Sequence, residues 1–135
     1  MKLSNFGFVE VGEWVTDKNS SCGINFKLNR YEDDRVLYAF VVEGEVKYVG
    51  ICKSDSTTLK KRMKRYIQNR TLSNSTNTRI IEKIKECLEK KGKVKIFGLK
   101  PILPLTYQDL GIDLVAGLEI PLIKELNSPW NTRKE

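Results

Sequence analysis

The first chemical feature of this sequence is that its 135 residues include no histidine. Histidine is the most frequent general acid or base in enzymes and a very common metal ligand. Catalysis by Ser-His or Cys-His pairs and metal binding through imidazole are therefore excluded. Acid–base chemistry in this chain must use Asp, Glu, Lys, Tyr or Cys side chains.

Two tyrosines lie in a stretch with the pattern of a β-hairpin, VLYAFVVEGEVKYVG at residues 36–50. A two-residue turn at Glu43 and Gly44 would place Tyr38 and Tyr48 on opposite faces of the hairpin. A three-residue turn, with Gly44 in the left-handed conformation, would place them directly across from each other. By hairpin geometry alone, such a pair is more often a stabilising aromatic contact in a core than a catalytic pair.

The three cysteines, Cys22, Cys52 and Cys87, are an odd number and show no C-x-x-C spacing. This pattern is not typical of a disulfide framework or of a zinc cluster. We interpret Cys22 and Cys87 as small packed side chains. Because no histidine is present to activate it, Cys52 is not expected to be a nucleophile.

The charge balance is basic, with 24 Lys and Arg against 17 Asp and Glu, a net charge of +7. This balance favours a polyanionic partner, and nucleic acid is the commonest one. A lysine-rich soluble surface would give the same balance, so charge alone leaves both interpretations open.

Length and composition indicate one globular domain, since 40% of the residues are hydrophobic and 30% are charged. No apolar run approaches the ~18 residues that a membrane span needs. The N-terminus also lacks the basic-then-apolar pattern of a signal peptide. We therefore expect a cytoplasmic protein that does not associate with a membrane.

Short alternating stretches predict the strands. Within residues 1–34, FVEVGEWV and INFKL flank the polar segment TDKNSSCG, which indicates an N-terminal hairpin or arm. Further strands are expected at about 35–42 and 45–50, and in KVKIFGLK before two prolines.

Helical spacing of apolar residues predicts three helices, in LKKRMKRYIQ, TRIIEKIKECLEKKG and DLVAGLEIPLIKELN. Asp113 is expected to be the N-cap of the last helix. Pro121 inside that helix predicts a kink or a break, because proline removes a backbone donor and crowds the preceding turn. Together the elements predict an α/β fold: a small antiparallel sheet of about three strands flanked by helices, with an N-terminal β arm at 1–34 and the main domain at 35–135.

Five short motifs, in order, resemble those of the GIY-YIG nuclease superfamily over about residues 35–131. No single motif is specific, but their order and spacing together are. The matching residues are Leu37-Tyr38, Tyr48-Val49-Gly50, Leu59 to Arg62 with Tyr66 one turn further on, Glu119 in GLEIPLIKEL, and Asn131 after Pro129. Two positions depart from the family pattern: Val36 replaces a glycine, and Ile51 replaces a lysine, with Lys53 two residues later.

The resemblance implies metal-assisted hydrolysis of the phosphodiester bonds of double-stranded DNA. It assigns Tyr48 as the general base for water, with Tyr38 sharing a hydrogen bond to the water or phosphate. Arg62 and Lys53 would favour the ionised tyrosine, because a nearby cation stabilises the phenolate. We expect both tyrosines on one face of a hairpin with the three-residue turn, and Arg62 facing them.

The remaining roles implied by the resemblance concern charge on the phosphate. Arg62 would stabilise the negative charge of the transition state. Glu119 would hold one Mg²⁺ or Mn²⁺, with the phosphate and waters completing its shell. Asn131 would bind near the leaving group or orient the glutamate, and Tyr66 would support the catalytic groups. Five further residues are expected to contact DNA: Lys60, Lys61, Arg65, Asn77 and Arg79.

Each of these residues also has an ordinary structural interpretation, such as a solvated helix face, a helix cap or a core tyrosine. The main alternative function is a DNA-binding module that keeps the GIY-YIG scaffold without cutting. A basic interaction domain unrelated to nucleic acid would require the order of the motifs to be accidental. Because there is little room for a recognition domain, specificity is expected from the arm and loops, from a partner or from a homodimer.

Overall fold

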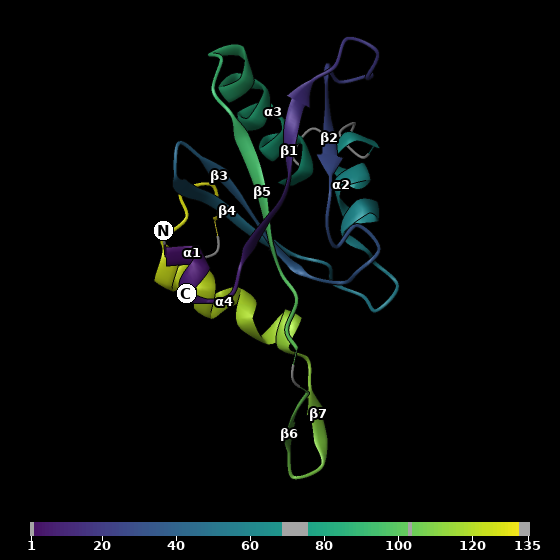
Figure 1. Cartoon of the computed structure of the whole chain (residues 1–135), viewed down its shortest axis with the longest axis vertical. Coiled ribbons are helices and arrows are strands. Elements are labelled where there is room, and N and C mark those ends of the chain that lie inside the picture. Colours follow the sequence, from purple (N-terminus) through teal and green to yellow (C-terminus); the bar gives the residue numbers. More distant parts are fainter. Residues whose placement is uncertain (1, 69–75, 103, 133–135) are drawn as a thin grey trace.

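The fold is described from a computed structural model that covers residues 2–68, 76–102 and 104–132. Five strands form one antiparallel sheet in the order β2-β1-β5-β3-β4 (Figure 1). Their bounds are β1 Val9–Thr16, β2 Ile24–Leu28, β3 Leu37–Val42, β4 Glu45–Ile51 and β5 Val94–Leu99. The helices are α1 Lys2–Asn5, α2 Leu59–Gln68, α3 Thr76–Glu89 and α4 Leu114–Leu126. A separate two-stranded hairpin consists of β6 Leu105–Tyr107 and β7 Leu110–Ile112.

The α/β class is confirmed, but the prediction of about three strands is wrong, because the sheet has five. The expected N-terminal hairpin exists, with Trp14 of β1 opposite Phe26 of β2. Strand β1 also pairs with β5, where Trp14 lies opposite Val94. The hairpin is therefore part of the main sheet, because β1 pairs with β2 on one side and with β5, from the second half of the chain, on the other.

Two hydrophobic cores lie on the two faces of the sheet (Figure 1). Helices α2 and α3 cover one face, where Met63, Tyr66 and Ile84 are buried against Trp14 and Phe40. Helices α1 and α4 cover the other face over β3 and β4. Strand β4 is an edge strand, so the helices of both layers meet around its free edge.

Helix α4 begins as predicted and does not break. The side chain of Asp113 accepts a hydrogen bond from the backbone N–H of Ala116 at 3.2 Å, which confirms the N-cap. Pro121 lies inside the helix, which continues to Leu126. Of the predicted kink or break at Pro121, the break is therefore excluded, and the helix tolerates the missing donor because its buried residues Leu122 and Ile123 pack on the sheet.

No strand is predicted from the sequence in the stretch that the β6–β7 hairpin occupies. Its two-residue turn, Gln108 and Asp109, has positive φ at both positions, 49° and 68°. Such a turn normally carries Asn or Gly, so the local sequence carries only a weak hairpin signal. None of the described helices is long and apolar enough to cross a membrane.

Candidate active site

The turn between β3 and β4 has two residues, Glu43 and Gly44, with φ of 51° and 77°. Val42 pairs with Glu45 across it, so the predicted three-residue turn is wrong. Further along, Phe40 lies opposite Tyr48, whereas Val41 lies opposite Val46. Lys47 is therefore the extra residue of a β-bulge, and a bulge reverses which side of the strand the following residues face.

Because of this bulge, Tyr38 and Tyr48 lie on the same face of the sheet, as predicted, although by a different route. Their ring centroids are 6.5 Å apart and both side chains are buried in the core beneath α2 and α3. They are diagonal neighbours, since Tyr38 lies opposite Gly50, so the predicted direct pairing of the two tyrosines is wrong. Val46 packs against the core on the opposite face.

The second tyrosine motif ends in a glycine because the Tyr38 ring occupies the space above it. A Cβ atom placed on Gly50 would lie 2.5 Å from both Cζ and Oη of Tyr38. Every other residue type has this atom, so the position requires glycine if the ring is to stay where it is.

Helix α2 brings Arg62 and Tyr66 to the tyrosine pair. The hydroxyl groups of Tyr38 and Tyr66 are 2.7 Å apart, and both side chains are buried. The Arg62 guanidinium carbon lies 4.1 Å from the centroid of the Tyr66 ring and 6.0 Å from that of Tyr38. The Arg62 side chain also donates a hydrogen bond to Asn77 Oδ1 at 3.2 Å. Within the described ranges no carboxylate pairs with Arg62, so its charge is available to an anion.

All six residues predicted to be catalytic line one hollow at the free edge of β4, with a volume of about 210 Å³. They come from five parts of the chain: β3, β4 and the loop after it, α2, α4 and the C-terminal segment. They are Tyr38, Tyr48, Lys53, Arg62, Glu119 and Asn131. Residues that the motifs did not single out complete the lining: Ile51, Thr76, Ile123 and Thr132.

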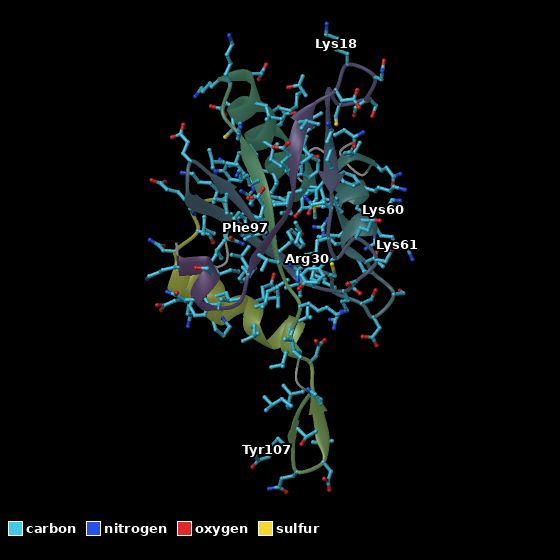
Figure 2. All side chains as sticks on the ribbon, in the orientation of Figure 1. Lys18, Arg30, Lys60, Lys61, Phe97 and Tyr107 are labelled. Atoms are coloured by element: carbon cyan, nitrogen blue, oxygen red, sulfur yellow. The ribbon has the colours of Figure 1, made fainter. Side chains whose placement is uncertain are left out.

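Among the residues expected to contact DNA, only Arg79 lines this hollow. Arg79 donates a hydrogen bond to the backbone oxygen of Trp130 at 2.7 Å, which joins α3 to the C-terminal segment. Lys60 and Lys61 are exposed on the outer side of α2 (Figure 2), and Lys61 donates a hydrogen bond to the backbone oxygen of Ser56 at 3.3 Å. Arg65 is also exposed, and Asn77 is bonded to Arg62.

Asn131 attaches the C-terminal segment to the edge of the sheet. Its side-chain oxygen accepts a hydrogen bond from the Val49 N–H, and its side-chain nitrogen donates one to the Val49 oxygen, both at 2.9 Å. The Ser128 hydroxyl donates a further hydrogen bond to the same side-chain oxygen. The amide thus replaces a neighbouring strand at Val49.

Burial raises the pKa of the tyrosines and outweighs the charge of Arg62, which lowers it in the expected direction. For Tyr48, burial raises the pKa more than hydrogen bonding with Tyr66 and the charge of Arg62 lower it. Burial likewise raises the pKa of Tyr38 and of Tyr66. The phenols are therefore protonated at neutral pH. Burial also raises the pKa of the Cys52 thiol, which supports the view that Cys52 is not a nucleophile.

Glu119 is the acidic side chain of the hollow. It is half-buried on α4, and no Lys or Arg of the described residues forms an ion pair with it. The described residues contain no group of three or more His, Cys, Asp or Glu placed to hold a metal ion. A single free carboxylate fits a Mg²⁺ ion that takes its other ligands from phosphate and water, and does not fit a zinc site.

No protein-family model matches the sequence, and no curated protein matches it significantly. The fold is similar to that of a glutamate-to-alanine mutant of bacteriophage T4 EndoII, a GIY-YIG endonuclease, with a TM-score of 0.72 and 24% identity over 96% of each chain. The chain shares the fold of T4 EndoII.

A second structural similarity is more distant. The restriction endonuclease HPY188I, solved in complex with product DNA, has a TM-score of 0.53 and 16% identity. The match covers 99% of this chain and 81% of HPY188I. The similarity to two DNA endonucleases agrees with the resemblance found in the sequence, and it extends to the N-terminal strands that the motifs did not include.

Proposed function

We propose that this protein is a metal-dependent endonuclease that hydrolyses phosphodiester bonds in double-stranded DNA. The observation that carries the proposal is the convergence of Tyr38, Tyr48, Lys53, Arg62 and Glu119 on one hollow at the edge of β4. The similarity in fold to two DNA endonucleases supports it. The hollow is open to solvent beside a sheet edge, which suits a long substrate.

Tyr48 acts as the general base. As a phenolate it takes a proton from the water whose oxygen attacks phosphorus, while the bond from phosphorus to the leaving oxygen breaks. Tyr38 is buried, and its hydroxyl group is hydrogen-bonded to that of Tyr66. Tyr38 therefore holds the Tyr66 hydroxyl in a fixed position beside the site. Because burial raises the pKa of Tyr48, the active phenolate is a minor species at neutral pH.

Arg62 binds the phosphate and stabilises the charge of its transition state. Its planar guanidinium is held against the Tyr66 ring and by Asn77, so it is oriented before the substrate arrives. Lys53 is exposed at the mouth of the hollow and contributes a second positive charge to the phosphate. Because these groups already have the orientation that the transition state needs, reorienting them during the reaction costs little free energy.

Glu119 would hold one Mg²⁺ or Mn²⁺ ion, with phosphate and water oxygens as its other ligands. When bound, the ion stabilises negative charge developing on the phosphate. Without the ion, the Glu119 carboxylate makes the hollow less attractive to DNA, because like charges repel.

The direct test is cleavage of a supercoiled plasmid by the purified protein with Mg²⁺ or Mn²⁺, with and without a chelator. We expect nicked or linear product only when the metal is available. If no DNA form is cut under any of these conditions, the enzyme assignment is wrong. Binding that persists without cutting would then support the alternative, a non-catalytic DNA-binding module.

A further inference from the structure

Lys53 is the one candidate catalytic residue that lies in a loop between two elements. Residues 52–58 connect the end of β4 to the start of α2, and Lys53 is exposed at the mouth of the hollow. Lysine side chains have much rotational freedom, and ordering one costs free energy. A lysine on a free loop would therefore contribute little to binding a phosphate at a fixed place, unless its backbone is held.

The Arg35 guanidinium holds two consecutive carbonyl groups of this loop. Its Nε donates to the Cys52 oxygen at 2.8 Å, and its Nη2 donates to the Lys53 oxygen at 2.9 Å. The backbone N–H of Cys52 also donates to the Val36 oxygen at 3.1 Å, next to the last strand pair of β3 and β4. Because Arg35 directly precedes Val36, the loop is tied to the start of β3 by main chain and side chain together.

The second edge of the same guanidinium is anchored on α4. Nη1 and Nη2 of Arg35 donate to the two carboxylate oxygens of Asp113 at 2.9 and 2.8 Å. Asp113 is the N-cap of α4, and that helix is packed on the sheet through buried Leu122 and Ile123. A bidentate pair restrains direction as well as distance. The loop at Lys53 is thus held against the helix that carries Glu119.

These bonds leave Arg35 itself unsuited to binding a phosphate. A guanidinium has five N–H donors, and the four bonds described above use four of them. The Arg35 side chain is 16% exposed, its charge is paired with Asp113, and it does not line the hollow. Any effect of Arg35 on the reaction must therefore act through the groups that it holds.

We propose that Arg35 is a positioning residue of the candidate active site and that it presents Lys53 to a phosphate of the substrate. Lys53 lies beyond the last strand pair of β4, which is Ile51 with Leu37, so strand pairing no longer restrains it. The hydrogen bond from Arg35 to the Lys53 oxygen supplies that restraint. The proposal rests on the proposed function, because it takes a DNA phosphate as the group that Lys53 meets.

The first test is a double-mutant cycle, measured as the single-turnover cleavage rate of a duplex with Mg²⁺. Arg35→Ala and Lys53→Ala should each lower the rate by about 10- to 100-fold, since a displaced catalytic group can cost that much. The double variant should be no slower than the slower single variant, because Arg35 has nothing to position once Lys53 is gone. If the two effects multiply, Arg35 acts independently of Lys53 and the proposal is wrong.

Two further variants separate geometry from charge. Arg35→Lys keeps the positive charge, but a single ammonium cannot reproduce the planar fork, so it should lose about as much activity as Arg35→Ala. Arg30→Ala is the matched control: Arg30 is an exposed arginine over the Tyr31 ring, and its loss should leave the rate unchanged. Circular dichroism and Tm would show which variants fold. Wild-type activity in a folded Arg35→Lys protein would overturn the proposal.

DNA affinity without metal separates this proposal from the proposed function. In wild type, Lys53→Ala should reduce the slope of log affinity against log salt by about 1. In the Arg35→Ala background the same change should reduce the slope much less, because Lys53 is no longer held at the phosphate. Equal reductions in both backgrounds would overturn the positioning role of Arg35, whether or not the protein cuts. A wild type that cuts no DNA but shows this difference would remove the proposed function and leave that role standing.

Discussion

The aromatic ring of Tyr38 lies directly over Gly50, and the fit leaves no room for a side chain there. A Cβ atom at position 50 would be 2.5 Å from the Tyr38 Oη and 2.7 Å from its Cε1. The two residues are also directly paired across β3 and β4. The glycine that ends the second motif is thus required by the tyrosine of the first.

Replacing Gly50 by alanine should displace the Tyr38 ring and disturb its contact with Tyr66. We expect Gly50→Ala to lower the free energy of unfolding by about 1–3 kcal/mol, the usual cost of overpacking, and to abolish cleavage. Gly117→Ala is the matched control, since Gly117 lies in α4 and a Cβ atom added there would meet nothing within 4 Å. It should stabilise the protein by up to about 1 kcal/mol, through helix propensity. Urea denaturation measures both, and a Gly50→Ala protein as stable as wild type would contradict the packing argument.

The pH dependence of cleavage should follow ionisation of Tyr48. Because burial raises its pKa, the phenolate fraction grows about tenfold per pH unit throughout the range below an ordinary tyrosine pKa of about 10. Single-turnover rates should therefore increase with pH, without a plateau near neutrality, and Tyr48→Phe should remove most activity. A wild-type plateau near neutral pH would show that the pKa of the base is lowered instead.

Arg62→Lys keeps the positive charge but loses the planar group that stacks on Tyr66 and bonds to Asn77. The two cations are not interchangeable where stacking and a fixed fork matter. We expect the cleavage rate to fall by about 10²- to 10³-fold, with a much smaller change in DNA affinity. Arg65→Lys, on the exposed side of the same helix, should cut normally. Equal activity of the two variants would remove Arg62 from the proposed site.

Affinity for duplex DNA should fall steeply with salt, because cations that bind phosphates release counterions. Lys53 is exposed at the hollow, whereas Lys18 extends from the tip of the β1–β2 hairpin (Figure 2). Lys53→Ala should reduce the slope of log affinity against log salt by about 1, and Lys18→Ala should leave it unchanged. Fluorescence anisotropy at several salt concentrations would measure both slopes. A flat salt dependence for wild type would show that phosphate contacts do not drive binding.

The sequence was most informative where local pattern and motif order agree. The helical spacing of apolar residues in LKKRMKRYIQ predicted α2, and two of these residues, Met63 and Tyr66, are buried in it. The set of candidate catalytic residues was also predicted, and the structure places all of its members around one hollow. Motif order could predict this set because the motifs belong to one fold, and that fold brings together residues that are distant in sequence.

Long-range pairing and strand irregularities could not be predicted in this way. Trp14 pairs with Val94 across most of the chain, and no local pattern specifies that partner. The bulge at Lys47 reverses the strand face, so an even turn with a bulge and an odd turn without one both place Tyr38 and Tyr48 on one face. The motifs predicted that both tyrosines lie on one face of the sheet. They did not specify the turn length or the bulge that places them there.

Asn131 shows a further limit of prediction from sequence. Its motif position predicted a contact near the leaving group or the glutamate, but the structure shows its amide paired with the backbone of Val49. A side chain that replaces a strand at a sheet edge has no sequence signal of its own. Which strand lies at the edge depends on the complete sheet order.

The most direct test of the proposed function compares Glu119→Gln with wild type in two assays on the same duplex: Mg²⁺-dependent cleavage and DNA binding without cleavage. The substitution keeps the size of the side chain and removes the charge that would hold the metal ion. We predict that cleavage falls by several orders of magnitude, because metal stabilisation of phosphate charge supplies several kcal/mol. DNA binding should stay level or tighten, since a carboxylate that repels phosphate is gone. Cleavage by Glu119→Gln at the wild-type rate would contradict the assignment of Glu119 and, with it, the proposed active site.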